Sequence, residues 1–128
     1  MERIYVDSDI FIYNIEQRAP WFARVHARLY ATPVRVVVSD LTRMECRVKP
    51  LAIGDAALLA EFDFAFSVSE LVPLTTAVFD RATQIRATYK FKTPDSIHLA
   101  AAVEGGCDVF LTNDLRLGAY TDISIEVV

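Results

Sequence analysis

Short apolar runs and amphipathic stretches alternate along the chain. The runs Arg3–Val6 and Val34–Ser39 are brief and mainly apolar, which is typical of parallel strands that are covered on both faces. The segments LVPL, Asp108–Asp114 and DISIEVV predict a third, fourth and fifth strand. This alternation predicts an α/β fold, with a central parallel sheet of four to five strands flanked by helices in an α/β/α arrangement.

Amphipathic spacing predicts the helices that connect these strands. Pro20 suits the first turn of the second helix, because its fixed φ is already helical. Pro50 and Pro73 are expected to separate neighbouring elements, because proline interrupts a helix. We expect helices at about residues 10–17, 20–31, 40–48, 56–66 and 75–89, and a last one from 93 to the glycine pair at 105–106.

Polar residues indicate where two of these helices begin. Ser39 and Asp40 can cap the helix after the second strand, although Thr42 and Glu45 also have the spacing of a capping box. Thr93 is the expected N-cap of the last helix, and the proline after it suits the first helical position.

Length and composition fit a single domain over residues 1–128. With 53% apolar residues and a mean hydropathy of +0.28, the chain can fill one core and leave apolar surface for a partner. No apolar span reaches transmembrane length, and the N-terminus lacks the apolar core and cleavage site of a signal peptide. We therefore expect a cytoplasmic protein with no membrane partner.

Charge and cysteine content exclude several functions. Thirteen basic and seventeen acidic residues give a net charge of −4, which is the wrong sign for binding nucleic acid by bulk charge alone. Cys46 and Cys107 are the two cysteines, and neither belongs to a CxxC motif or a Cys/His cluster. A disulfide framework and a structural zinc site therefore lack support, and we expect two buried free thiols.

Acidic residues occur where the predicted strands end, which is the binding edge of an open parallel sheet. Asp7 and Asp9 follow the first strand, and Asp114 follows the fourth. Glu45 lies in the helix after the second strand, and Asp95 lies in the first turn of the last helix. Most of these acids have an ordinary alternative role as a helix cap, a turn residue or an exposed acid. Asp7 is harder to explain in this way, because a partly buried, unpaired carboxylate is costly.

Convergence of three or four carboxylates would favour a metal site. Each close pair repels by roughly 4 kcal/mol at about 4 Å with an effective dielectric constant near 20, and a divalent cation relieves that repulsion. Oxygen ligands without histidine or cysteine suit Mg²⁺ or Mn²⁺, which bridge phosphate oxygens. The residues alone therefore make phosphoryl chemistry the leading hypothesis.

Four motifs cover nearly the whole chain in a fixed order: YVDSDIFIY, SDLTRMEC, KTPDSIHLAAA and VFLTND. Together they resemble the PIN-domain nucleases, especially the VapC toxins of type II toxin–antitoxin modules. The resemblance implies a metal-dependent ribonuclease whose acidic site consists of Asp7, Glu45, Asp95 and Asp114. It implies Mg²⁺ or Mn²⁺ held by Asp7, Asp95 and Asp114, with Glu45 as a ligand or general base. The supporting residues that it implies are Ser8, Asp9, Thr112 and Asn113.

Two positions depart from the family pattern. Asp9 stands where the family commonly has Asn, so it either adds charge to the metal site or caps the next helix. Arg116 and its neighbours stand where some relatives carry a further acid, so any metal relies on the upstream carboxylates.

The resemblance also implies a reaction and partners. We expect hydrolysis of phosphodiester bonds in structured RNA such as transfer RNA, leaving a 5′-phosphate and a 3′-hydroxyl. We expect a homodimer and a VapB-like antitoxin that masks the site. RNA must approach an acidic protein, so basic residues are needed at the rim of the site. The alternative interpretation of such residues is an ordinary solvated face. The candidate rim residues are Arg43, Arg47, Lys49, Lys90 and Lys92.

A histidine and three phenylalanines remain open to two interpretations. His98 follows Asp95 by three residues, so it is either a hydrogen-bond donor to the site or a packing residue. The residues Phe62, Phe64 and Phe66 could stack on bases, although core or dimer packing is the simpler interpretation.

Two other functions compete with the nuclease interpretation. Asp7 and Asp9 have the DxD spacing of haloacid-dehalogenase-like phosphatases, but the Gly/Thr-rich continuation of that family is missing. The non-enzymatic alternative is a receiver-like or catalytically degenerate PIN-like module that binds a metal or a partner. The third strand carries no acid for a receiver, so the degenerate PIN-like module is the stronger form. It predicts no metal-dependent phosphodiesterase activity.

Overall fold

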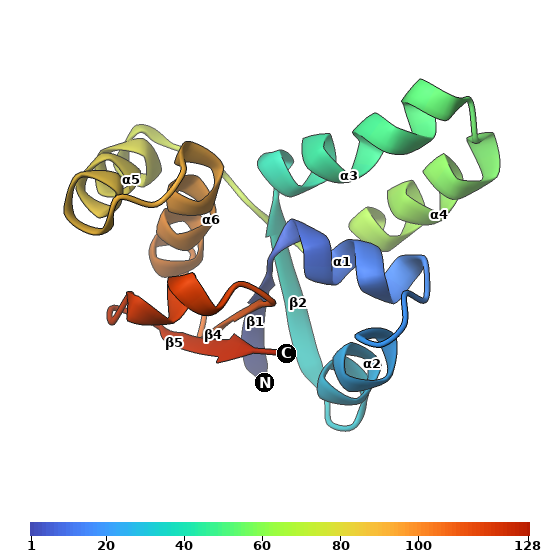
Figure 1. Ribbon diagram of the computed structural model, residues 1–128, viewed down its shortest axis with the longest axis horizontal. Coiled ribbons are helices and arrows are strands. Elements are labelled where there is room, and N and C mark those ends of the chain that lie inside the picture. Colours follow the sequence, from blue (N-terminus) through green and yellow to red (C-terminus); the bar gives the residue numbers. More distant parts are fainter.

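The computed structural model describes residues 1–128 as a five-stranded parallel sheet with helices on both faces (Figure 1). The strand order is β3-β2-β1-β4-β5. The strands are β1 (Glu2–Val6), β2 (Val34–Ser39), β3 (Glu70–Val72), β4 (Val109–Thr112) and β5 (Ser124–Val127). The helices are α1 (Ser8–Ile15), α2 (Phe22–Tyr30), α3 (Asp40–Ile53), α4 (Ala56–Ser67), α5 (Thr76–Tyr89), α6 (Thr93–Glu104) and the 3₁₀ helix η1 (Leu115–Ala119). The predicted α/β class and parallel sheet are confirmed.

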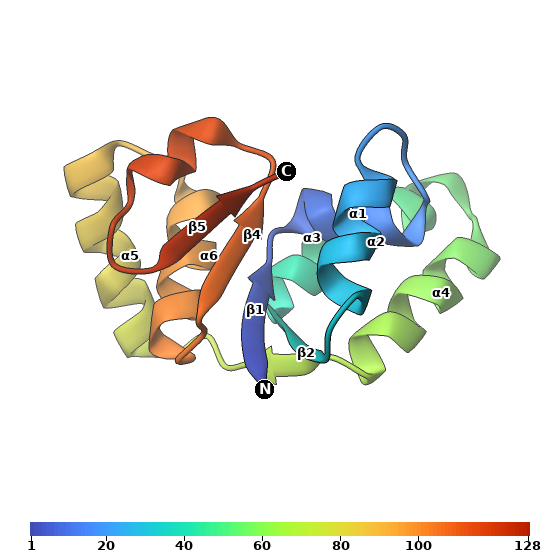
Figure 2. The same ribbon diagram turned by 90° about the horizontal axis from the view of Figure 1, so that it is seen from below.

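Alternating side chains of the strands divide the core into two layers. Tyr5, Val37 and Phe110 pack with α5 and α6 on one face. Val6 and Val38 pack with the helices α1 to α4 on the other face. The two groups of helices lie on opposite sides of the sheet in both views (Figures 1 and 2). Because both faces are buried, the strands are mainly apolar, and this is the property that made them predictable.

The chain order reverses beside the first strand. β1 pairs with β2 on one side and with β4 on the other, and all three strands are parallel. In such sheets, ligands bind at the carboxyl ends of the strands next to this reversal. Asp7 directly follows β1, and its backbone N–H donates to the Leu111 carbonyl of β4 at 3.0 Å. The ends of the two strands are therefore tied together at the place where a site is expected.

Of the three prolines that were expected to mark boundaries, Pro73 does so, because it directly follows β3, whereas Pro20 and Pro50 behave differently. Pro20 does not begin a helix: it lies in a turn, and α2 begins at Phe22. The turn is held by Trp21, whose ring stacks on Tyr13 of α1 at a centroid distance of 4.4 Å. Pro50 does not end α3, because it is buried inside that helix, where packing against α4 offsets one missing hydrogen bond.

The caps of α3 and α6 also differ in detail from the prediction. Ser39 is the N-cap of α3 and forms a reciprocal capping box with Thr42, so the alternative pair of Thr42 and Glu45 was wrong. Glu45 is thereby free for other contacts. α6 begins at Thr93 with Lys92 as its N-cap, one residue earlier than predicted. The 3₁₀ helix η1 was not predicted from the sequence.

Both cysteines are free thiols. Cys46 is buried as predicted, whereas Cys107 is only partly buried. Burial raises the pKa of the Cys107 thiol to about 11, so this group stays protonated at neutral pH. Separately, none of the helices combines the length and the apolar character that a membrane crossing needs.

Candidate active site

An acidic cleft of about 380 Å³ opens at the carboxyl edge of the sheet. Its walls come from α1, α3, α6 and the segment after β4, so residues far apart in the sequence meet there. All four acids singled out by the motifs lie in this cleft, together with Asp9. The lining residues are Asp7, Ser8, Asp9, Glu45, Asp95, His98, Asn113, Asp114 and Leu115.

Asp7 is fixed at the base of the cleft by hydrogen bonds to both of its carboxylate oxygens. It is the N-cap of α1, and Oδ1 accepts the backbone N–H of Ser8 at 2.8 Å. The buried Thr112 hydroxyl at the end of β4 donates to Oδ2 at 2.8 Å. Burial nevertheless raises the pKa of Asp7, and it outweighs these two bonds and the nearby His98. The carboxylate is thus held in place without a full counter-charge.

Glu45 lies in the second turn of α3 and lines the same cleft as Asp7. Its Oε1 accepts a hydrogen bond from the Ser8 hydroxyl at 2.7 Å and lies 2.6 Å from Nε2 of His98. Partial burial acts to raise the pKa of Glu45, but the hydrogen bonds from His98 and Ser8 outweigh it and the pKa falls below its usual value. Glu45 is therefore ionised at neutral pH.

His98 belongs to a buried polar chain that crosses the edge of the sheet. Its Nδ1 lies 2.7 Å from the Tyr5 hydroxyl, which in turn lies 2.8 Å from the Ser39 hydroxyl. Both rings are almost completely buried. His98 therefore contacts the site through Glu45, as the hydrogen-bonding interpretation of this residue predicted. The contact of Tyr5 with His98 was not predicted from the sequence, because a tyrosine within an apolar strand cannot be told from an ordinary core residue.

Asp9 and Asp95 are the least compensated acids of the cleft. Neither accepts a hydrogen bond from a protein donor, and the pKa of each is raised by partial burial and then by neighbouring carboxylates. Asp95 lies in the first turn of α6 and Asp9 in the first turn of α1, so each helix dipole partly balances the charge. The electrostatic potential of the cleft remains strongly negative.

Asp114 differs from the other acids of the cleft, because it forms a close ion pair with Arg116. It is the N-cap of η1, and the guanidinium of Arg116 donates to both carboxylate oxygens, at 3.1 Å from Nε and 2.6 Å from Nη2. These hydrogen bonds hold the pKa of Asp114 below its usual range. The same guanidinium lies 4.0 Å from Asp95. Asn113 also lines the cleft and donates to the Tyr13 hydroxyl at 2.8 Å.

The donor set fits a hard divalent cation. It consists of carboxylate oxygens from separate elements, and no cysteine lines the cleft. The carboxylates of Asp9 and Asp95, which have no hydrogen-bond donor, are the groups that such an ion would compensate. No three Asp, Glu, His or Cys side chains are already gathered as a ready-made metal cluster. Binding therefore requires small side-chain movements, above all a release of Asp114 from Arg116.

The five basic residues expected at the rim fall into two groups. Three lie on α3 and form ion pairs outside the cleft: Arg43 with Asp40, Arg47 with Asp63, and Lys49 with Glu16. Lys90 and Lys92 are exposed on the segment that leads into α6. Lys92 is close enough to Asp114 to lower the pKa of that carboxyl. The second group is the better placed to meet a ligand that enters the cleft.

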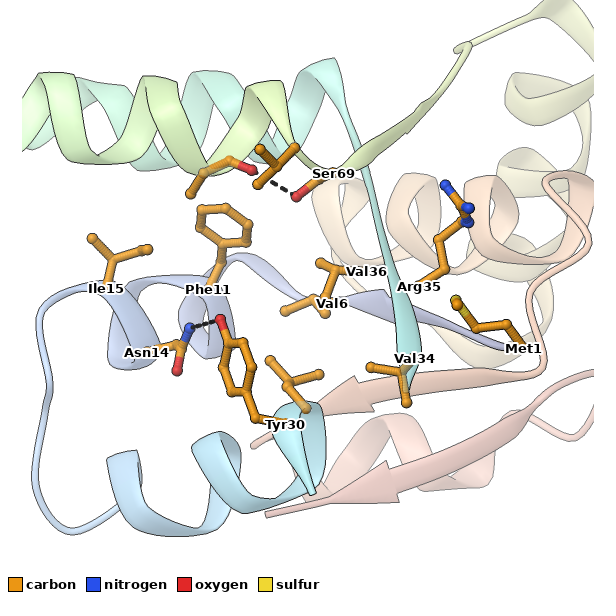
Figure 3. Close-up of a pocket in the computed structure, with 13 residues that line it drawn as sticks. Met1, Val6, Phe11, Asn14, Ile15, Tyr30, Val34, Arg35, Val36 and Ser69 are labelled. Atoms are coloured by element: carbon orange, nitrogen blue, oxygen red, sulfur yellow. Dashed lines mark hydrogen bonds between the residues drawn. The ribbon is translucent and has the colours of Figure 1, made fainter. Parts of the chain in front are cut away.

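A second cavity, of about 340 Å³, has a different chemistry. It lies among α1, α2, α4 and the start of β2, and its walls are mostly apolar (Figure 3). Phe11, Tyr30 and Val36 are among the side chains that face it, and Asn14 donates to the Tyr30 hydroxyl at its edge at 3.3 Å. It contains no acid and does not include the phenylalanines of α4. Of these, Phe62 and Phe66 are buried in the core, and Phe64 is 71% exposed.

Comparison with known proteins agrees with this architecture. The PIN domain family model matches residues 4–122, so the chain belongs to the PIN domain family. A search of curated protein sequences gave no significant match.

Three solved structures illustrate the fold. VapBC from Salmonella typhimurium, solved bound to DNA, is similar with a TM-score of 0.77 and 22% identity over 98% of each chain. A toxin–antitoxin complex from Klebsiella pneumoniae gives a TM-score of 0.78 and 21% identity over 94% of each chain. VapC20 of Mycobacterium tuberculosis, described as a toxin that cleaves the sarcin–ricin loop, gives 0.70 and 16% identity over 94% of this chain and 98% of its own.

Proposed function

We propose that the protein is a metal-dependent endoribonuclease of the VapC type. The observation that carries this proposal is the convergence of Asp7, Glu45, Asp95 and Asp114 on one cleft of a PIN domain. A protein of similar fold is described as a toxin that cleaves the sarcin–ricin loop, which supports RNA as the substrate class.

Asp7, Asp95 and Asp114 are the proposed ligands of Mg²⁺ or Mn²⁺. Bound there, the ion would supply a Lewis acid that neutralises the scissile phosphate and activates the attacking water. Asp7 is preorganised for this role, because Ser8 and Thr112 orient its two oxygens. Asp9 and Asp95 add negative charge that attracts the cation.

Glu45 is the proposed general base. It is ionised at neutral pH, lines the same cleft as Asp7 and can accept a proton from the attacking water. In-line attack on the phosphorus then breaks the bond to the 3′-oxygen, which leaves with a proton as a 3′-hydroxyl. The other product carries a 5′-phosphate. Lys90 and Lys92 are proposed to contact the RNA backbone beside the cleft.

The test is cleavage of a labelled transfer-RNA pool and of a sarcin–ricin hairpin by purified protein with Mg²⁺ or Mn²⁺. We expect cleavage that stops with EDTA and in Asp7→Asn, and fragments with 5′-phosphate ends. Folded protein that cuts neither RNA in either metal would favour the degenerate PIN-like module instead. Fragments with cyclic phosphate ends would refute the water mechanism.

We also propose that a VapB-like antitoxin inhibits the protein, which itself forms a homodimer. Two observations support this: the Salmonella and Klebsiella relatives are toxin–antitoxin complexes, and this chain exposes apolar side chains along α3. Co-expression with a protein encoded next to this one tests the proposal. A complex that elutes as one species and lacks nuclease activity is the expected result, and a complex with undiminished activity would contradict it.

A further inference from the structure

The two oxygens of Glu45 have different surroundings. Oε1 receives both protein contacts, from the Ser8 hydroxyl at 2.7 Å and from His98 Nε2 at 2.6 Å. Oε2 has no hydrogen-bond partner in the protein. The side chain of Glu45 is 30% exposed and lines the acidic cleft, so one oxygen is anchored while the other remains available.

The histidine that anchors Oε1 is itself fixed. His98 is 1% exposed, and its Nδ1 lies 2.7 Å from the hydroxyl of Tyr5, which is fully buried. The Tyr5 ring meets His98 edge-on at 5.7 Å and stacks on Phe110 at 5.5 Å. The Tyr5 hydroxyl also lies 2.8 Å from the Ser39 hydroxyl. Neither ring can therefore rotate without breaking a buried hydrogen bond, which is costly.

This arrangement determines where one hydrogen of His98 lies. A carboxylate only accepts hydrogen bonds, so Nε2 must carry a hydrogen that points at Glu45. The Tyr5 hydroxyl can donate or accept, so it satisfies Nδ1 in either protonation state of the ring. The Nε2–H donor is thus directed at Oε1 at 2.6 Å, and the Ser8 hydroxyl lies farther from Nε2, at 3.3 Å.

We infer that His98, held by Tyr5, is a positioning residue that keeps Oε1 of Glu45 hydrogen-bonded and leaves Oε2 as the one oxygen of Glu45 that can react. A glutamate has three rotatable bonds, and on α3 alone it could turn either oxygen toward the cleft or toward solvent. The buried chain removes that freedom before the substrate arrives, as orienting hydrogen bonds do in other hydrolytic sites. The effect on the reaction rests on the proposed nuclease function, whereas the contact itself does not.

The activity test uses two amide substitutions that separate the two ring nitrogens. In His98→Gln the amide nitrogen can reach the place of Nε2 and keep the bond to Glu45. In His98→Asn the amide can replace only Nδ1 and keep the bond to Tyr5. We expect His98→Gln to retain kcat within about threefold, and His98→Asn and Tyr5→Phe to lower kcat by about 10- to 100-fold with little change in KM. Thermal unfolding of each variant shows whether it is folded.

Equal losses in folded His98→Gln and His98→Asn, or full activity in Tyr5→Phe, would overturn the inference. A contact test is independent of the nuclease reaction: long-range ¹H–¹⁵N spectra of the histidine side chains in the wild type and in Glu45→Ala. We expect a slowly exchanging Nε2–H in the wild type that exchanges faster in Glu45→Ala. An Nε2 without hydrogen, or exchange that Glu45→Ala leaves unchanged, would refute the contact. Wild type that cuts no RNA but shows this Nε2–H would refute only the nuclease.

Discussion

The acidic cleft has two halves that hold their carboxylates by opposite means. In the hydrogen-bonded half, Asp7 and Glu45 are oriented by neutral hydroxyls and by His98, without a guanidinium or an ammonium group. In the arginine-paired half, Asp114 is held by the exposed guanidinium of Arg116. Burial raises the pKa of Asp7, whereas the arginine lowers the pKa of Asp114.

This difference separates two tasks. Buried hydrogen bonds fix geometry and leave the negative charge available to a cation. An exposed ion pair contributes little stability and opens readily, because water and salt compete with it. The hydrogen-bonded half is therefore the preorganised part of the site, and the arginine-paired half is the part that can change when a cation or RNA enters.

The largest effect is expected from Asp7→Asn. The substitution removes a proposed ligand but can keep the shape of the hydrogen-bonded half, so RNA cleavage should fall by more than about a hundredfold. Because partial burial raises the pKa of Asp7 and no arginine or lysine pairs with its carboxylate, thermal stability in the absence of metal should be retained or should increase. Asp80→Asn on the exposed face of α5 is the charge-matched control. An active Asp7→Asn would remove Asp7 from the mechanism.

The second-largest effect is expected in the way the free energy of unfolding depends on pH. Asp7, Asp9 and Asp95 have raised pKa values in the folded state, so the folded protein binds protons more tightly than the unfolded chain. The metal-free protein should become more stable as the pH falls from neutral through the raised pKa values of these three carboxyls, and this stability should be lost as the pH rises through them again. Scanning fluorimetry across this range measures it. Asp7→Asn should flatten the curve, and an unchanged slope would contradict the burial argument.

A smaller effect is expected from Arg116→Ala, which frees Asp114. With its cation gone, the arginine-paired half should bind Mn²⁺ about two- to fivefold more tightly, and less so at high salt. Titration calorimetry measures the affinity. Arg18→Ala, which breaks an ion pair with Glu16 outside the cleft, is the matched control. Weaker Mn²⁺ binding in Arg116→Ala would show that the arginine supports the site.

The smallest effect is expected from Lys92→Ala. Lys92 lies near Asp114 and makes no side-chain capping bond, so its loss should leave the fold intact and raise KM for RNA about twofold. Arg47→Ala is the comparison, because Arg47 is paired with Asp63 on the outside of α3 and α4. Equal effects of the two substitutions would mean that RNA does not enter beside α6.

The strands were predictable because a parallel sheet buried on both faces demands short apolar runs, and β2 was predicted with its observed bounds. The positions of the acids followed from the rule that parallel strands end at one edge. Helix ends were less predictable: Pro50 continues α3 because contacts with α4 override its local tendency.

Two features of the site depended on tertiary contacts that leave little trace in the sequence. The polar chain joins Tyr5 and His98, which are 93 positions apart. Tyr5 looks like a core residue on its own, and His98 was predicted only as one of two alternatives, a donor to the site or a packing residue. The pairing of Arg116 with Asp114 depends on the tight turn of η1, which the sequence analysis did not predict.

The metal dependence of the proposed cleavage can be measured by following Mn²⁺ binding and RNA cleavage in the same samples, by electron paramagnetic resonance and by gel analysis, for the wild type and Asp7→Asn. We expect cleavage to rise with the fraction of protein that holds Mn²⁺, and we expect Asp7→Asn to lose both. Cleavage that persists without bound metal, or Mn²⁺ binding that Asp7→Asn leaves unchanged, would contradict this expectation.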